Sequence, residues 1–241
     1  MFINIYSGDK MFGTKKRDLV KLETDAELNS GDALVRTGKD GEKYIIVIPG
    51  NQSEALKELE HMIDYIVAGT NGVESIEKII KFVNNKIKDN PSWKGDSPIV
   101  DLDKAIKNME GGEAEKTVIL YLLLKYKGYY DVYYNEGTKT YYDFTKAPKN
   151  MTINKEKYKV NISHYSWLTL NMNGKSYLID PESPFLIDAE MPFATYKKEP
   201  VQIIDANTLN NLSEKERRKL FGQLEYLSEK ERRKLFGQLE I

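Results

Sequence analysis

Three short segments carry residue types that could cooperate in acyl-transfer or hydrolytic chemistry. Glu113 follows a two-glycine turn, 111–112, at the start of an apolar helix, where the helix macrodipole stabilises a negative charge. His164 and Tyr165 lie on a strand-like run, and Asp180 ends a later one. A helix N-terminus facing a histidine and an aspartate on neighbouring strands would suit an activated nucleophile with its base and orienting carboxylate.

The nucleophile is missing from this arrangement. The chain has no cysteine, which excludes a thiolate nucleophile, a disulfide framework and a thiolate metal site. Glu113 and Asp180 could act as acid and base, but nothing in the sequence places them at a suitable separation. The same two residues with His164 could hold a metal, although no ligand spacing supports that site. The glycine turn lacks the lysine of a phosphate-binding loop, and we expect neither a metal nor a cofactor.

Length and charge restrict the classes of partner. The 241 residues are enough for one large domain with an appendage. Lys and Arg total 36 against 37 Asp and Glu, so the charge points neither to nucleic acid nor to an anionic membrane. No run approaches the ~20 apolar residues needed to cross a bilayer. We therefore expect a cytoplasmic protein that binds neither nucleic acid nor membrane.

The order of the predicted elements favours the α+β class. Residues 1–50 hold strand-like runs separated by turn residues, which predicts a small N-terminal β element. Three helices follow, with predicted N-caps at Ser53, Ser75 and Asp101. We divide the chain into the β element, a core over 51–195 and a helical tail over 196–241.

The middle of the core is predicted to be a buried helix followed by a sheet. The helix 113–127 is apolar nearly all round, so it belongs in the interior. The asparagine-glycine pair 173–174 is a strong hairpin signal. Strands are predicted at 129–134, 140–144, 166–172 and 176–179. We therefore expect a helical half packed on an antiparallel β-sheet.

These elements resemble the transglutaminase-like family, within the papain-like superfamily of cysteine proteases and acyltransferases. The resemblance covers roughly 75–181, where the helices 79–89 and 102–109 match the two helices before the family's nucleophile. Further anchors are Lys125, Gly128, Trp167, Gly174, Asp180 and Pro181. The resemblance implies a substrate cleft in which a cysteine at the helix start is paired with a histidine and an aspartate on neighbouring strands.

The anchors assign residues of this chain to the three catalytic positions of the family. Glu113 falls in the cysteine position, Tyr165 in the histidine position and Asp180 in the aspartate position. Two of the three catalytic identities are therefore lost. The resemblance also implies that Gly112 and Trp167 line the remnant cleft, where a protein or peptide segment could still bind.

A slip of one residue in each segment gives a different assignment. Ala114 then takes the cysteine position and His164 the histidine position, beside the same Asp180. Alanine in place of a catalytic cysteine is the usual inactivating substitution. The slip would, however, move Lys125 onto a face that should be apolar and turn His164 to the opposite side of the strand from Trp167.

Each candidate residue also has a plain structural interpretation. Glu113 suits the first turn of any helix, and Tyr165 and Trp167 could be core aromatics. His164 could be a surface histidine, and Asp180 could simply end a strand. These interpretations need no active site.

The tail contains an exact internal repeat, because residues 212–225 recur at 227–240. Each copy opens with a capping box, which predicts two short helices. The apolar residues of the pair are Leu220, Phe221, Leu224, Leu235, Phe236 and Leu239. This surface could mediate self-association or dock a partner, or the tail could be a solvated appendage without a role.

Three functional hypotheses follow. The first is a non-catalytic transglutaminase-like protein that acts as a peptide-binding or structural module. The second is an inactivated form of a cysteine hydrolase or acyltransferase acting on amide bonds, with the cysteine replaced at position 113 or 114. The third is an interaction or assembly protein that works through the duplicated tail.

Overall fold

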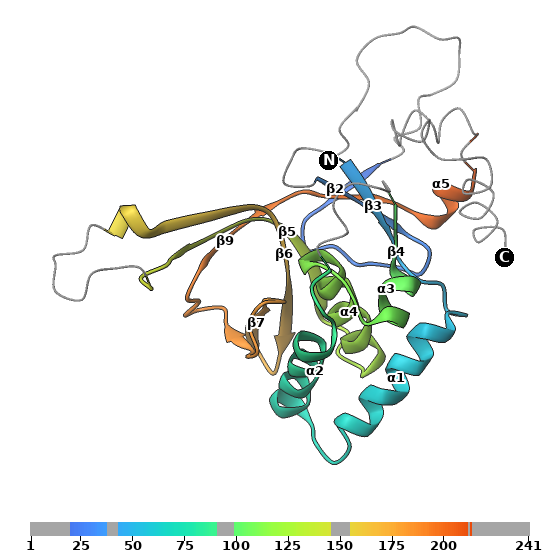
Figure 1. Ribbon diagram of the computed structural model, residues 1–241, viewed down its shortest axis with the longest axis horizontal. Helices are drawn as coiled ribbons and strands as arrows, with labels where there is room; N and C mark the ends of the chain where they lie inside the picture. Colours follow the sequence, from blue (N-terminus) through green and yellow to red (C-terminus); the bar gives the residue numbers. More distant parts are fainter. Residues whose placement is uncertain (1–19, 38–42, 91–98, 146–154, 212, 214–241) are drawn as a thin grey trace, which may run out of the picture.

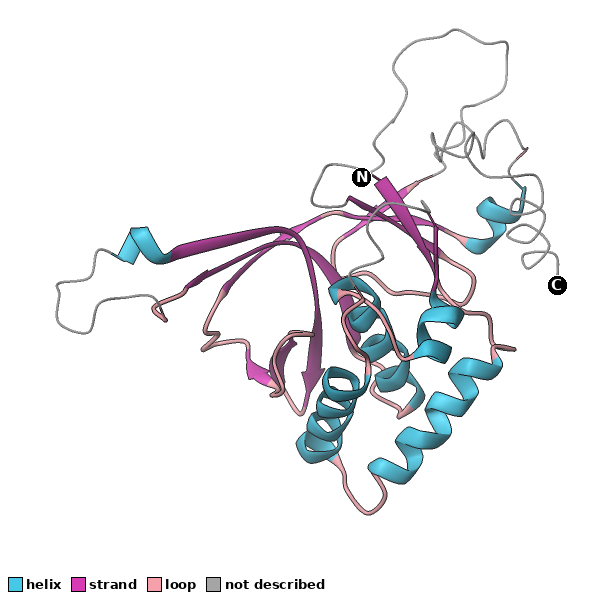
Figure 2. Ribbon diagram, in the orientation of Figure 1, coloured by secondary structure: helices cyan, strands magenta, loops and turns pink. Residues whose placement is uncertain are grey.

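The computed structural model describes residues 20–37, 43–90, 99–145, 155–211 and 213. Over these ranges the chain forms five α-helices and two five-stranded sheets (Figures 1 and 2). The predicted α+β class is confirmed. Within the described ranges, none of the helices has the length and apolar character needed to span a membrane.

The helices begin and end where local capping signals occur. Their bounds are α1 (Glu54–Ile66), α2 (Gly72–Lys86), α3 (Leu102–Asn108), α4 (Glu113–Tyr126) and α5 (Ala206–Asn211). Ser53 caps α1 by accepting the Leu56 N–H at 3.0 Å, and Asp101 caps α3 by accepting the Lys104 N–H at 3.1 Å, as predicted. The predicted cap at Ser75 is wrong, because α2 already begins at Gly72 and Ser75 lies buried inside its first turn.

The second half of the chain builds an antiparallel sheet with the strand order β8-β7-β6-β5-β9. Its strands are β5 (Val132–Tyr142), β6 (Lys159–Met172), β7 (Lys175–Ile179), β8 (Ile187–Asp188) and β9 (Thr195–Glu199). The predicted hairpin joins β6 to β7, and both Asn173 and Gly174 adopt positive φ angles, 54° and 75°, which a type I′ turn requires. We call this the second sheet.

The first sheet combines segments from distant parts of the chain. Its order is β1 (Lys21–Glu23), β10 (Val201–Ile204), β2 (Ala33–Thr37), β3 (Lys43–Val47) and β4 (Ile99–Asp101). The expected N-terminal β element thus pairs with one strand from the predicted core and one from the predicted tail. The described part of that tail contributes strand β10 before the short helix α5, and residues 212 and 214–241 of the duplicated segment lie outside the described residues.

Helix α4 is the centre of the core. It contacts α1, α2 and α3 as well as β5 and β6, and Figure 1 shows it surrounded by these elements. Val118, Ile119, Leu120, Leu123 and Leu124 are all fully buried, which explains why the helix is apolar nearly all round. The N-terminus of α4 points to the junction of the two sheets, where the candidate site lies.

Candidate functional site

A β-bulge in β6 decides which face of the sheet each candidate residue occupies. The β5–β6 register shifts between Gly137 and Lys139, and His164, opposite this shift, has a φ of +56°. On the other edge of β5, Gly137 allows β9 to approach closely, because a Cβ there would lie 1.9 Å from the carbonyl oxygen of Lys197. Beyond the bulge, Tyr165 faces away from the helices and the next residue, Ser166, faces α4.

Glu113, on the first turn of α4, binds β6 directly. Its Oε1 accepts hydrogen bonds from both the backbone N–H and the hydroxyl of Ser166. The Ser166 hydroxyl also lies 3.2 Å from the hydroxyl of Thr117, one helical turn further on. The Glu113 side chain keeps only 23% of its accessible surface, and Arg36 approaches its Oε2 at 3.8 Å. The carboxylate therefore acts as a link between α4 and the backbone of β6.

Arg36 of β2 brings the first sheet into the same contact. Its side chain is 1% exposed, and its Nη1 pairs with Glu136 at 2.6 Å and donates to the Tyr134 hydroxyl at 3.1 Å. Nη2 donates to the carbonyl oxygen of His164 at 2.5 Å, a group that belongs to the bulge. Nε is buried and has no hydrogen-bond partner among the residues that the structure describes. We call Arg36, Glu113, Tyr134, Glu136 and Ser166 the helix-side cluster.

Burial changes the protonation behaviour of this cluster. Loss of solvent raises the pKa of Glu113 to about 7, against the opposing effects of Arg36 and the Ser166 hydrogen bonds. Burial also raises the pKa of the neighbouring Glu115. Within the described ranges, Arg36 is the one cation that acts on both of these carboxyl groups and on Glu136, so acidic groups outnumber cations at this place. Glu113 can therefore take up a proton close to neutral pH.

A second polar cluster lies on the opposite face of the second sheet. Asp180 accepts hydrogen bonds from the hydroxyls of Tyr165 and Tyr196, both at 2.5 Å, and from the backbone N–H of Glu182 at 2.9 Å. Lys139 pairs with Asp180 at 2.7 Å and with Glu182 at 3.2 Å, and it donates to the Tyr165 hydroxyl at 3.0 Å. Lys139, Asp180 and Tyr165 are buried. Burial, and then the negative charge of Asp180, raise the pKa of both tyrosines.

This second cluster fastens the segment 180–194, which we call the strap, across the face of the sheet. Under the strap, Trp167 is fully buried and its ring lies 5.2 Å from that of Tyr196. Trp167 packs with Tyr165, Leu178 and Ile187 in a small apolar core. We call Lys139, Tyr165, Asp180, Glu182 and Tyr196 the strap-side cluster. Because Trp167 is covered, it does not line an open cleft in this structure.

The structure brings together some of the predicted site residues and separates others. Tyr165 and Asp180 are hydrogen-bonded, whereas Glu113 reaches β6 from the other face through Ser166. In the alternative register, Ala114 packs in the apolar core and the side chain of His164 is exposed. Gly112 is the N-cap residue of α4, where a Cβ would lie 2.9 Å from Oε2 of Glu115.

Sequence reasoning missed the two cations that organise the clusters. Arg36 is two residues from the fully buried Leu34 along β2 and therefore lies on the same, inward face, where a charge needs a partner. Lys139 likewise lies on the same face of β5 as Gly137 and Tyr141, the face that the strap covers. A charged residue in phase with buried neighbours was the signal that could have identified both. Within the described ranges, no group of three or more His, Asp or Glu residues is arranged to hold a metal ion.

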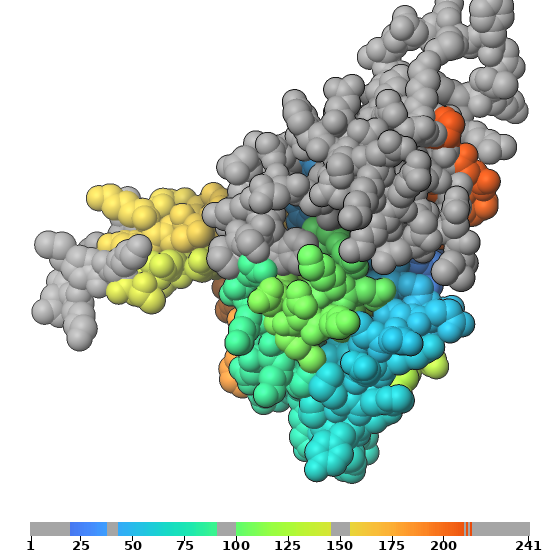
Figure 3. Space-filling view, turned by 45° about the vertical axis from the view of Figure 1, so that its right-hand side comes forward, coloured from blue at the N-terminus to red at the C-terminus, as the bar shows by residue number. Residues whose placement is uncertain are grey.

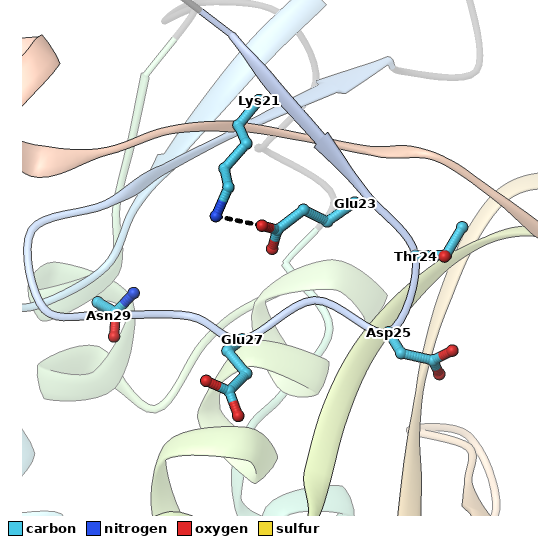
Figure 4. Close-up of a pocket in the computed structure, with 6 residues that line it drawn as sticks. All are labelled: Lys21, Glu23, Thr24, Asp25, Glu27 and Asn29. Carbon is cyan, nitrogen blue, oxygen red and sulfur yellow. Dashed lines mark ion pairs between the residues drawn. The ribbon is translucent and has the colours of Figure 1, made fainter. Parts of the chain in front are cut away.

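One hollow lies apart from both clusters, under the segment that leads from β1 to β2 (Figure 4). Its volume is about 410 Å³, and its lining is Lys21, Glu23, Thr24, Asp25, Glu27 and Asn29. Lys21 points to Glu23 and forms an ion pair with it, and Asp25 pairs with Lys198 outside the hollow. The charges are therefore largely satisfied within the chain.

No protein-family model matches the chain, and no curated protein matches its sequence. Among solved structures it is distantly similar to a "putative protease" from Parabacteroides distasonis, at 15% identity and a TM-score of 0.33 over 54% of this chain and 24% of that one. It is also similar to a "putative cysteine protease" from Cytophaga hutchinsonii, at 10% identity and a TM-score of 0.35 over 65% and 53%. The chain thus spans about a quarter and about half of these two proteins, and it contains no cysteine.

Proposed function

We propose that this chain is a non-catalytic module that associates with protein or peptide partners, on a fold that resembles the transglutaminase-like family. One observation carries the proposal. Glu113, in the position that the resemblance assigns to the nucleophile, is bonded to the backbone and hydroxyl of Ser166. A carboxylate committed to two hydrogen bonds inside the fold is a structural brace rather than a reagent.

The other two assigned positions support the same proposal. Tyr165 and Asp180, the first residue of the strap, are bonded to each other and to Lys139. Asp180 is 1% exposed and Tyr165 is 2% exposed, so neither can reach a substrate without displacing the strap. General acid–base catalysis requires groups that reach the substrate and act together. Tyr165 and Asp180 are buried, and Glu113 lies on the other face of the sheet.

An inactivated cysteine enzyme is the second candidate, and thiol chemistry distinguishes it. A cysteine introduced as Glu113→Cys would lie at the N-terminus of α4, where the macrodipole and Arg36 would both favour the thiolate. One introduced as Ala114→Cys would lie in the apolar core, where burial disfavours the thiolate. The second candidate requires at least one of them to attack an amide carbonyl.

The test combines alkylation and hydrolysis. Both cysteine variants and the unmodified chain are incubated with iodoacetamide across a pH series, and separately with fluorogenic peptide amides. We expect no hydrolysis by any of the three proteins and slow alkylation of Ala114→Cys. Peptide cleavage by the unmodified chain would overturn the proposal. Cleavage by either cysteine variant, together with a thiol pKa well below the usual ~8.5, would favour the inactivated enzyme instead.

A further inference from the structure

The outer parts of β5 and β6 project from the body as an arm, which comprises residues 138–145 and 155–163 among those described. Figure 3 shows the arm extending away from the helices. One edge of β6 pairs with β5 over nearly the whole strand, whereas the other edge pairs with β7 only from Leu168 to Met172. Within the described residues, the edge of β6 opposite β5 is therefore open along the arm. We call the stretch 159–163 of this edge the open edge.

A hydrogen bond at the outer end of the arm shows which backbone groups face the open edge. The carbonyl oxygen of Tyr158, just before β6, accepts from the N–H of Asp143, so Tyr158 faces β5. Successive residues of a strand direct their N–H and C=O groups to alternate sides. Lys159 and Asn161 therefore direct both of their backbone groups away from β5, to the open edge.

Nearer the body, the same edge of β6 is satisfied within the chain. From Leu168 onward, β7 provides the partner strand. Where β7 ends, side chains replace it, because Glu113 accepts the N–H of Ser166 and Arg36 donates to the carbonyl oxygen of His164 at 2.5 Å. Among the described residues, none bonds to the outward backbone groups of the open edge. The supply of partners thus stops where the arm leaves the body.

The other strand edges are protected in ways that the open edge is not. Strands β1, β4 and β8 are only two or three residues long. Strand β9 carries the exposed Lys197 and Lys198 and is followed by Pro200, and lysine and proline discourage pairing with another chain. The open edge has no proline, and its one charge, Lys159, lies at its end. Within the described part of the two sheets, it is the edge best suited to accept a further strand.

The sequence of the open edge is complementary to itself in the antiparallel direction. A two-fold axis at Asn161 places this residue opposite its counterpart, Val160 opposite Ile162, and Lys159 opposite Ser163 of the other copy. Apolar side chains then meet apolar ones on one face, and no two like charges lie directly opposite each other. The outward N–H and C=O of Asn161 would bond to the same groups of its counterpart. A second copy therefore matches the open edge in both its backbone groups and its side chains.

We propose that two copies of this chain pair antiparallel along their open edges, about a two-fold axis at Asn161, so that their second sheets become continuous. This inference rests on the proposed function, because it names a second copy of this chain as the associating partner. A contact in which both copies use the same surface is closed after two copies. The assembly is therefore a dimer that grows no further.

Because the chain has no cysteine, single introduced cysteines can locate the axis. The Cα atoms of a hydrogen-bonded antiparallel pair lie about 5.5 Å apart, a separation that a disulfide spans. We expect Asn161→Cys to cross-link to its counterpart under mild oxidation. The control is Ser163→Cys, which is also exposed but would lie opposite Lys159 rather than opposite itself. Ser163→Cys should cross-link instead when it is mixed with Lys159→Cys.

Sedimentation velocity of the full chain measures the association without a cross-link. A range from about 1 µM to about 200 µM covers the usual affinity of small transient interfaces, and the mass of the unmodified chain should rise toward two copies. Asn161→Pro removes the outward N–H and leaves the bonds to β5, since proline is tolerated at a strand edge. The two hydrogen bonds lost from the dimer should weaken it at least about tenfold.

Asn161→Ala is the matched control for the proline variant. Both variants lose the hydrogen bond that the Asn161 side chain accepts from the Thr140 hydroxyl at 2.7 Å, but only the alanine keeps the backbone N–H. Asn161→Ala should therefore associate as the unmodified chain does. Circular dichroism melting checks that each variant folds, and if Asn161→Pro melts early, the cysteine variants decide the question.

Four results would overturn the inference. These are an unmodified chain that stays monomeric at the highest concentration, growth past two copies, an Asn161→Pro variant that dimerises as tightly as Asn161→Ala, and a Ser163→Cys variant that cross-links to itself as fast as Asn161→Cys. None of these results bears on catalysis, so the proposed function fails separately, by peptide cleavage.

Discussion

Strand β6 separates two buried ionic clusters that differ in how completely they are satisfied. In the strap-side cluster, Asp180 accepts four hydrogen bonds or ion-pair contacts, and Lys139 uses its ammonium on three partners. In the helix-side cluster, Nε of Arg36 has no hydrogen-bond partner within the described part of the chain, and Glu113 has a pKa raised to about 7. The comparison shows two ways to bury a carboxylate. Asp180 is paired with a cation, whereas Glu113 can be neutralised by taking up a proton.

The two clusters also join different parts of the fold. The strap-side cluster connects strands and a loop within the second sheet, so its partners are close in sequence, between 139 and 196. The helix-side cluster connects β2 of the first sheet to α4, β5 and β6, across sequence separations of up to 128 residues. Loss of a member should therefore loosen the strap in one case and the contact between the sheets in the other.

The largest effect is expected from Lys139→Met. This change leaves Asp180 buried without a cation, and breaking such a pair costs about 3–5 kcal/mol. Urea unfolding of the full chain measures the loss. The exposed pair of Lys159 with Glu156 provides the control, since Lys159→Met should cost less than about 0.5 kcal/mol. A loss below about 1 kcal/mol for Lys139→Met would show that Asp180 does not depend on Lys139 as its burial implies.

A smaller effect is expected from Arg36→Met, about 2–4 kcal/mol. The two carboxylates left without Arg36 are less costly to bury than Asp180 would be. Glu136 keeps 12% of its side-chain surface exposed, and Glu113 can take up a proton. The pKa of Glu113 should rise further in this variant, since Arg36 lowers it. The comparison between the clusters would be reversed if Arg36→Met cost clearly more than Lys139→Met in the same urea series.

Tyr165→Phe removes one hydroxyl from Asp180 and keeps the ring. We expect a loss of about 1.5–3 kcal/mol, the usual contribution of a hydrogen bond to a charged group. Tyr130→Phe is the matched control, because the Tyr130 side chain is exposed. A loss no greater than that of the control would mean that Tyr165 contributes only its ring, as a core aromatic.

The smallest effect, and the one most dependent on pH, is expected from Glu113→Gln. A carboxyl whose pKa is raised from 4.5 to about 7 contributes stability below pH 4.5 that is lost as the pH rises through about 7. The glutamine keeps an oxygen for Ser166 and does not ionise. The variant should therefore gain about 1–3 kcal/mol relative to the unmodified chain between about pH 5 and about pH 8. Parallel stability curves over that interval would show that Glu113 does not hold a proton.

Local signals in the sequence predicted much of the fold. The asparagine-glycine hairpin, the caps at Ser53 and Asp101 and the buried helix α4 all follow from interactions within a few residues. The prediction of Ser75 as an N-cap was wrong because a serine can also lie inside the first turn of a helix. Here α2 begins three residues before it, at Gly72. Propensity identifies the helix more reliably than its first residue.

The candidate site was less predictable because it depends on the bulge. Tyr165 lies on β6 and Asp180 directly follows the neighbouring strand β7, which the hairpin signal implied. The side of the sheet that Tyr165 faces depends on the bulge at His164, with φ +56°, where the β5–β6 register shifts between Gly137 and Lys139, and a bulge of this kind reverses the alternation of side chains. Arg36 comes from another sheet, and no local pattern links it to the start of α4.

The role of Glu113 as a brace can be measured by a carbon-13 NMR titration of its carboxyl group, with the amide proton of Ser166 followed in the same samples. We expect the carboxyl to titrate with a pKa of about 7, and the Ser166 amide to shift with the same midpoint because it donates to that carboxylate. A carboxyl that titrates near 4.5, with a Ser166 amide that does not respond, would contradict the brace and with it the proposal that this position has left catalysis.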